Sequence, residues 1–431
     1  MKKRTRVLGA ALALMLALPT GVSAQDVSYL TITAREKDYS TTVTAIKVPV
    51  EDNPVIAGEN PLTGEAWEGQ YKPVMTTIDT HPEAYPLWGV GSADIMFEMP
   101  IQQDGSTRGL ALYMSEIPEG SGPVRSARIA AASLREIFNA PLVFYGMRTV
   151  TSTSVKDWWK KYHKECWVNG KFDYPLIDLM QGRYNVGYYQ RVKDGHQNPH
   201  NVLVDVATIR DMGTTNAEPV VFLFNDEGLT SGAEVNSITI PYKDNYVPAY
   251  LYDEKQGVYY RFNNGEQTID GLTNQPVTFS NVILLRTNIT WKGTAGAVIP
   301  LIGQGVCDIF INGYYQRGTW VRASSKKANE EDSIDERIVF LDENGEELVL
   351  KRGSTFISIM DNEQEVDIAA VGDVQIEGAK AAPTPKAIAT PAPTRTPRPT
   401  RTPKPESGES TEQVKTETED DGGDGDVSFG G

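Results

Sequence analysis

The stretch that says most about the fold of this chain is residues 122–145, which read GPVRSARIAAASLREIFNAPLVFY. A Gly-Pro pair marks a turn. After it, apolar side chains such as Leu134 and Phe138 recur at helical spacing, which predicts an amphipathic helix over residues 126–138. The apolar run at 141–145 predicts a strand. We therefore expect a helix that packs against strands.

The same patterns extend in both directions from this stretch. Residues 74–78, 95–99 and 110–114 predict strands, whereas from residue 218 onward nearly every segment has strand character, including an Asn344-Gly345 hairpin signal. The expected fold class is a mixed α/β (α+β) fold, with layered sheets and helices in an N-terminal lobe and a mostly antiparallel β lobe after it. The expected domains are a signal peptide (1–24), an N-terminal strand segment (25–59), an N-terminal α/β lobe (60–213), a C-terminal β-rich lobe (214–375) and a disordered tail (376–431).

The N-terminus predicts export from the cytoplasm. A basic start over residues 1–6 precedes an apolar stretch over 7–18, and small residues stand at Val22-Ser23-Ala24. This is the pattern of a secretory signal peptide cut after Ala24. A membrane anchor would need about 20 apolar residues. We expect a secreted or wall-associated protein with no membrane span, and no lipid-bearing cysteine near the cleavage point.

Composition narrows the classes of partner. The formal charge is −16, and removal of residues 1–24 makes it more negative still, because that segment carries basic but no acidic residues. Nucleic-acid binding depends on neutralising phosphates, so nucleic acid is not an expected partner. Cys166 and Cys307 are too few for a disulfide framework. One bridge between them and two separate buried thiols both remain open.

The C-terminal segment differs in composition from the rest of the chain. Residues 390–405 read TPAPTRTPRPTRTPKP, and an acidic, Gly-rich end follows. Such a sequence cannot build a core and favours extended polyproline II structure. We expect it to be disordered. Two roles remain open, a spacer that threads through cell-wall polymer and a solubilising tail without a partner.

Several ordered motifs resemble the YerB-like envelope proteins of Gram-positive bacteria. The resemblance covers about residues 60–360. It implies a mixed α/β body with layered sheets and a location in the cell envelope, and it implies no settled reaction. The motifs that carry it are Asn60-Pro61-Leu62-Thr63-Gly64, His81-Pro82, Ala93-Asp94-Ile95-Met96-Phe97-Glu98, Gly105-Ser106-Thr107-Arg108, Gly122-Pro123-Val124-Arg125-Ser126-Ala127-Arg128, Pro199-His200-Asn201-Val202 and Gly318-Thr319-Trp320.

Two arginines in the central motif are the strongest candidates for a binding site. At the start of the expected helix, Arg125 and Arg128 stand three residues apart and so are expected to share a face of its first turn. Guanidinium groups suit carboxylates and phosphates. The expected ligand-binding residues are Arg125, Arg128, Arg108, His200 and Asn201. The carboxylates expected to face them, which are also the candidates for acid–base catalysis, are Glu98, Asp94 and Asp104.

Three kinds of function fit these residues. The first is a binding or regulatory protein that recognises peptidoglycan, another wall polymer or a wall-active enzyme through an arginine-lined cleft. The second is a glycan-cleaving enzyme that uses Glu98 with Asp94 or Asp104. The third is a structural wall component. We expect no cofactor and no metal, because His196 and His200 flank a proline and no further ligands with suitable spacing are evident.

Overall fold

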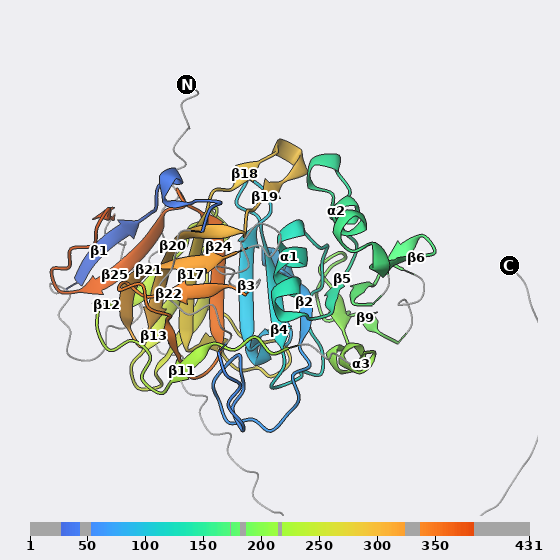
Figure 1. The fold of residues 1–431 in the computed structure, drawn as a ribbon, viewed down its shortest axis with the longest axis horizontal. Coiled ribbons are helices and arrows are strands. Elements are labelled where there is room, and N and C mark those ends of the chain that lie inside the picture. Colours follow the sequence, from blue (N-terminus) through green and yellow to red (C-terminus); the bar gives the residue numbers. More distant parts are fainter. Residues whose placement is uncertain are drawn as a thin grey trace, which may run out of the picture. The chain divides into compact units, whose positions relative to one another are not determined.

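A computed structural model describes residues 27–43, 53–172, 174–181, 187–213, 218–323 and 337–382. The expected signal peptide and most of the expected tail, from residue 383 onward, lie outside these ranges. Within them the chain forms two extended sheets and three α-helices (Figure 1). None of the described helices is both long and apolar enough to span a bilayer.

The main sheet is mixed and has ten strands. The pairings of β3 (Ile95–Pro100) with β24 (Thr355–Asp361) and of β24 with β17 (Asn281–Thr287) join strands that are far apart in the sequence, whereas β3 and β4 (Thr107–Tyr113) form a hairpin. The β3–β24 pair is parallel, with Ile95 opposite Thr355 and Glu98 opposite Ser358. In spatial order the strands are β8 (Leu176–Asp178), β5 (Leu142–Phe144), β2 (Val74–Asp79), β4 (Thr107–Tyr113), β3 (Ile95–Pro100), β24 (Thr355–Asp361), β17 (Asn281–Thr287), β20 (Gly303–Ile311), β21 (Tyr314–Arg322) and β22 (Val339–Leu341).

The second sheet is antiparallel and joins the first where β12 pairs with β21, at Ala233 opposite Tyr315. Residues 376–382, which begin the segment expected as a tail, contribute its edge strand, β26. The strands are β26 (Lys380–Ala381), β1 (Val27–Ile32), β25 (Val366–Val371), β12 (Ala233–Thr239), β13 (Pro248–Asp253) and β14 (Val258–Asn263), and β14 also pairs with β15 (Glu266–Gln267) and β16 (Thr278–Phe279).

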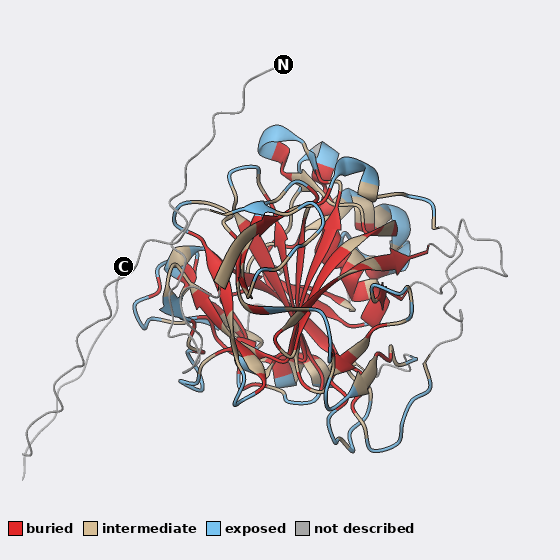
Figure 2. Cartoon of the chain, turned by 90° about the vertical axis from the view of Figure 1, so that its left-hand side faces the viewer, coloured by how far each residue is buried: buried red, intermediate tan, exposed pale blue. Residues whose placement is uncertain are grey.

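Both faces of the main sheet are buried, which explains its nearly continuous apolar strands. Successive side chains of a strand point to opposite faces. Accordingly, Phe97 packs into one core cluster with the helices over residues 129–138 and 155–162, and Met96 packs into the other cluster with the second sheet and the helix over 206–211. On β17, Ile283 likewise packs into the cluster of Phe97, and its neighbour Val282 packs into the cluster of Met96. The buried strands therefore fill the centre of the folded body, with exposed segments around them (Figure 2).

The helix expected over residues 126–138 starts later, as α1 (Ile129–Phe138). Arg128 has extended backbone angles (φ −127°, ψ 160°), because residues 125–127 run alongside residues 145–147 and exchange backbone hydrogen bonds with them. The helix ends at Asn139, in the left-handed conformation that asparagine tolerates. Arg125 and Arg128 therefore lie on an extended segment, and the expected shared helical face is wrong.

The expected α+β class with layered sheets is also wrong. Strands account for 41% of the described residues and helical residues for 13%, so the described protein is mostly β and is built on a large mixed sheet. Beside α1, the described helices are α2 (Val155–Tyr162) and α3 (Val206–Asp211).

The remaining strands form four small two-stranded ladders outside the two sheets. These are β6 (Trp167–Val168) with β7 (Lys171–Phe172), β9 (Tyr189–Arg191) with β10 (Val202–Val204), β11 (Leu223–Asn225) with β23 (Val349–Lys351), and β18 (Thr290–Trp291) with β19 (Ala297–Val298). Cys166 and Cys307 are both buried, and no disulfide joins them.

Candidate functional site

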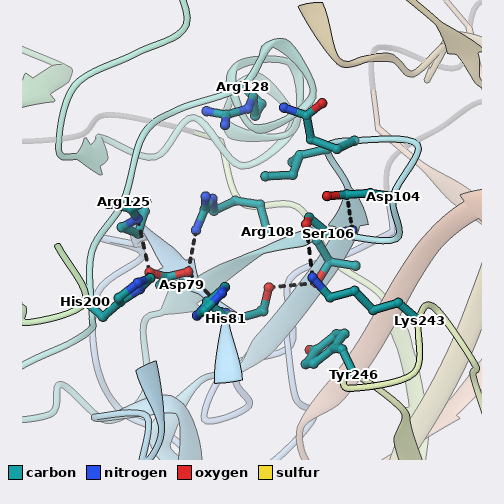
Figure 3. A pocket seen from close by; sticks show the side chains of 14 residues that line it. Asp79, His81, Asp104, Ser106, Arg108, Arg125, Arg128, His200, Lys243 and Tyr246 are labelled. Atoms are coloured by element: carbon teal, nitrogen blue, oxygen red, sulfur yellow. Dashed lines mark hydrogen bonds and ion pairs between the residues drawn. The ribbon is translucent and has the colours of Figure 1, made fainter. Parts of the chain in front are cut away.

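A cationic pocket of about 250 Å³ lies at the end of β2 and β4 (Figure 3). Its wall carries four basic side chains, Arg108, Arg125, Arg128 and Lys243, but only two carboxylates. In a chain with a formal charge of −16, this concentration of positive charge is local. The other lining residues are Asp79, Thr80, His81, Ile101, Gln102, Asp104, Ser106, Thr107, His200 and Tyr246.

Asp79, the last residue of β2, holds one side of the pocket together. Its carboxylate accepts a hydrogen bond from Arg108 Nη1 at 3.0 Å and another from His200 Nδ1 at 2.6 Å. Arg125 Nε lies 3.0 Å from Oδ2 as an ion pair, without hydrogen-bond geometry. Burial alone would raise the pKa of Asp79, but the two guanidinium groups and His200 outweigh burial and lower it. Asp79 is therefore ionised and neutralises part of the cluster.

Arg128 has no comparable partner. Its Nη1 donates to the backbone carbonyl oxygens of Ser126 and Ala127, at 3.1 and 3.0 Å. Among the described residues, no carboxylate forms an ion pair with it. Burial, together with the charges of Arg108, Arg148 and Arg125, lowers the pKa of Arg128 to about 9. Arg108 forms an ion pair with Asp79, whereas Arg128 forms no ion pair within the described residues.

The opposite wall comes from the loop between β12 and β13. Lys243 Nζ donates to Ser106 Oγ at 3.1 Å, which joins this loop to the turn between β3 and β4. The two loops touch closely at Gly105, where φ is +83° and an added Cβ would overlap the carbonyl oxygen of Tyr242. Only glycine allows this approach without strain. The pocket therefore depends on residues more than 130 positions apart in the sequence.

Of the three carboxylates expected to face the arginines, only Asp104 lines the pocket, and neither Arg125 nor Arg128 forms an ion pair with any of the three. Glu98 is fully buried; it accepts hydrogen bonds from Thr107 Oγ1 (2.7 Å) and Tyr246 OH (2.6 Å). Its ion-pair partner is Arg261, at 3.3 Å. Glu98 does not line the pocket. It touches the pocket wall through Thr107 and Tyr246, two lining residues whose hydroxyls donate to the Glu98 carboxylate.

Asp94 and Asn201 also lie outside the pocket lining. Asp94 is buried, where it accepts hydrogen bonds from Asn60 Nδ2 (3.0 Å) and from the backbone N–H of Met114 (2.6 Å). Burial raises its pKa despite these bonds. Asn201 bonds to Arg191 and to the carbonyl of Val192. Of the predicted residues, Arg108, Arg125, Arg128, His200 and Asp104 do meet in one place.

Sequence reasoning missed the central residue of the site. Asp79 carries a weak signal, because it ends an apolar strand directly before the His81-Pro82 pair. His81 stacks on His200, with ring centroids 4.6 Å apart. Lys243 and Tyr246 have no signal at all in the sequence, because they reach the pocket only when two distant loops pack together.

Comparison with known proteins places the chain in a family. Residues 62–219 match a family described as "Protein of unknown function (DUF3048) N-terminal domain", and residues 238–357 match its C-terminal domain. A relative from Bacillus subtilis (strain 168), described as "Putative lipoprotein YerB", is 26% identical over 325 residues, which is 72% of this chain and 88% of the relative.

A solved structure supports the same assignment at the level of the fold. The crystal structure of the YerB protein from Bacillus subtilis matches with a TM-score of 0.58 at 24% identity, and the match covers 72% of this chain and 99% of that chain. The resemblance inferred from the ordered motifs is thereby confirmed. The chain belongs to the YerB-like family, whose two domains are described as being of unknown function.

Proposed function

We propose that this protein is a binding protein of the cell envelope that takes an acidic group of a wall polymer into the Arg108–Arg125–Arg128 pocket. The observation that carries the proposal is Arg128, a partly buried cation beside other arginines with no carboxylate partner among the described residues. Burying an unpaired charge is unfavourable. A bound carboxylate or phosphate would supply the missing charge, and guanidinium groups bind both through paired hydrogen bonds.

The envelope location rests on two supports. The N-terminal pattern is that of a signal peptide. The relative in Bacillus subtilis carries the description of a lipoprotein, which is an envelope protein by definition. The peptidoglycan of such an envelope contains carboxylates, and its associated polymers contain phosphates. The volume of about 250 Å³ suits one acidic sugar unit or a smaller group.

The glycan-cleaving alternative is less well supported. General acid–base catalysis needs a carboxyl group within hydrogen-bond reach of the substrate. Glu98 and Asp94 are both buried away from the pocket lining, and Glu98 is already engaged by Arg261. An acidic surface of a wall-active enzyme would fit the same cationic pocket, so the test also measures whether the protein captures a wall hydrolase.

The test is co-sedimentation of the purified full chain with peptidoglycan sacculi, with and without their anionic polymers, at low and high salt. We expect binding by the wild type, a loss of about tenfold in Arg128→Met, which corresponds to 1.4 kcal/mol, and weaker binding at high salt. Arg35→Met is the matched control, because it removes one positive charge from an exposed arginine outside the pocket. Equal binding by the wild type and Arg128→Met would contradict the proposal. Capture of a wall hydrolase without binding to sacculi would favour the enzyme partner.

A further inference from the structure

Three groups able to bind a metal meet at one edge of the pocket. His81, Glu83 and His200 each offer a ligand atom, and these atoms all lie within 4.8 Å of one another. Glu83 does not line the pocket, and its side chain is 66% exposed. His200, in contrast, is buried. The three residues reach this point from the turn after β2 and from the segment before β10.

The hydrogen bonding of His200 fixes which of its nitrogens is available. Nδ1 lies 2.6 Å from Oδ2 of Asp79, and a carboxylate oxygen accepts, so Nδ1 is the donor of this pair. Nε2 is the ring nitrogen that remains available to a metal. Its neighbour at 3.4 Å is Oε2 of Glu83, which is also an acceptor. His200 Nε2 and the Glu83 oxygen repel each other as two acceptors unless a proton or a metal cation lies between them.

From this arrangement we propose a divalent transition-metal site formed by His200 Nε2, a His81 ring nitrogen and the Glu83 carboxylate. Histidines that bind metals usually donate their other ring N–H to a carboxylate, as His200 does to Asp79. Imidazole with one carboxylate suits zinc and neighbouring metals rather than calcium or magnesium. Three protein ligands leave a fourth tetrahedral position open.

Two features set the strength of this site. Nδ1 of His81 accepts a hydrogen bond from the Glu83 backbone N–H at 3.2 Å, and a metal bound through that nitrogen replaces it. Arg125 and Arg108, which share the Asp79 carboxylate, repel a cation. Asp79 and Glu83 together oppose that repulsion. We therefore expect affinity near 10 µM, about −7 kcal/mol, which is weaker than in structural zinc sites.

The probe is Zn²⁺ alone, titrated by calorimetry into the full chain after treatment with a chelator and its removal. We expect one saturable site, and a loss of affinity of about tenfold or more in both Glu83→Gln and His81→Gln. Both side chains are exposed, so the variants keep the fold. His163→Ala is the matched control, because it removes a histidine that also contacts two carboxylates, Glu136 and Glu165.

Three outcomes overturn the site. The first is the absence of saturable binding below about 1 mM, which would leave a proton, not a metal, between His200 and Glu83. The second is wild-type affinity in Glu83→Gln or His81→Gln. The third is an equal loss in His163→Ala, which would place the zinc elsewhere. Polymer binding by Glu83→Gln, measured without metal, separates this proposal from the cationic pocket, because Glu83 is not among the lining residues.

Discussion

Asp79 and Arg108 face each other directly across β2 and β4, and their side chains form a buried ion pair at 3.0 Å. Neighbouring strands thus bring a carboxylate and a guanidinium together at the edge of the pocket. The carboxylate also holds Arg125 and His200. The cationic cluster is therefore built around one acid, and its members differ in what they contribute to stability.

The stability of the protein should depend strongly on Arg108 and only weakly on Arg128 when each is replaced by methionine. Arg108→Met leaves the buried Asp79 short of its best partner, so we expect the free energy of unfolding to fall by about 3–5 kcal/mol. Arg128→Met removes an unpaired charge and two backbone hydrogen bonds, so we expect a change within about 1 kcal/mol. Urea unfolding measures both. An equally large loss in Arg128→Met would make that residue a structural brace and remove the basis of the binding proposal.

Asp308 forms a buried ion-pair cluster in the main sheet, and we expect this cluster to be sensitive to acid. It is buried between Arg286 and Arg317, with the Arg317 pair at 2.8 Å. Burial alone would raise the pKa of Asp308, but the two arginines lower it. A lowered pKa stabilises the fold at pH values above the unfolded-state pKa of about 3.9. That contribution disappears as the pH falls through the folded-state pKa.

Asp308→Asn should therefore be less stable than the wild type near pH 7, by about 3–5 kcal/mol. The difference should narrow progressively below about pH 4. Urea unfolding of both proteins across this pH range measures it. A difference that stays constant down to pH 2 would show that the asparagine acts through lost packing and not through lost charge.

Gly105 and Gly345 form a matched pair of glycines with positive φ, +83° and +80°. An added Cβ at Gly105 would overlap Tyr242, whereas at Gly345 it would meet open space. We expect Gly345→Ala to lower stability by about 1 kcal/mol, the strain of the left-handed conformation. Gly105→Ala should cost more and should weaken polymer binding, because the loop that carries Lys243 must move. Equal thermal unfolding temperatures for the two variants would contradict this.

Glu98→Gln tests whether Glu98 supports the fold or reacts. Because Arg261 would lose its carboxylate partner in the interior, we expect a loss of stability of about 3–5 kcal/mol. Polymer binding by the remaining folded protein should change little, since Glu98 does not line the pocket. If the wild type cleaves a wall glycan and a stably folded Glu98→Gln variant does not, the result would support the hypothesis of a glycan-cleaving enzyme that uses Glu98.

Local patterns located many of the strands, but they misplaced the start of one helix. Apolar runs such as 95–99 were recognisable because a strand buried on both faces needs no polar alternation. The helix beginning at Ile129 was placed too early. Helical spacing continues back through Arg125, but backbone pairing with residues 145–147 holds that segment extended. Tertiary pairing outweighed local periodicity, because each extended residue gained a partner that the sequence does not reveal.

The sequence by itself determined that arginines gather near one turn, that His200 belongs with them and that the chain is a YerB-like protein. These are properties of residue type and order. Only the tertiary structure decided that Asp79, and not Glu98 or Asp94, faces the arginines, and that Lys243 closes the pocket from a distant loop. Which carboxylate meets which guanidinium depends on strand register and loop packing. A shift of one residue turns a side chain to the other face of a sheet, and local spacing does not specify that register.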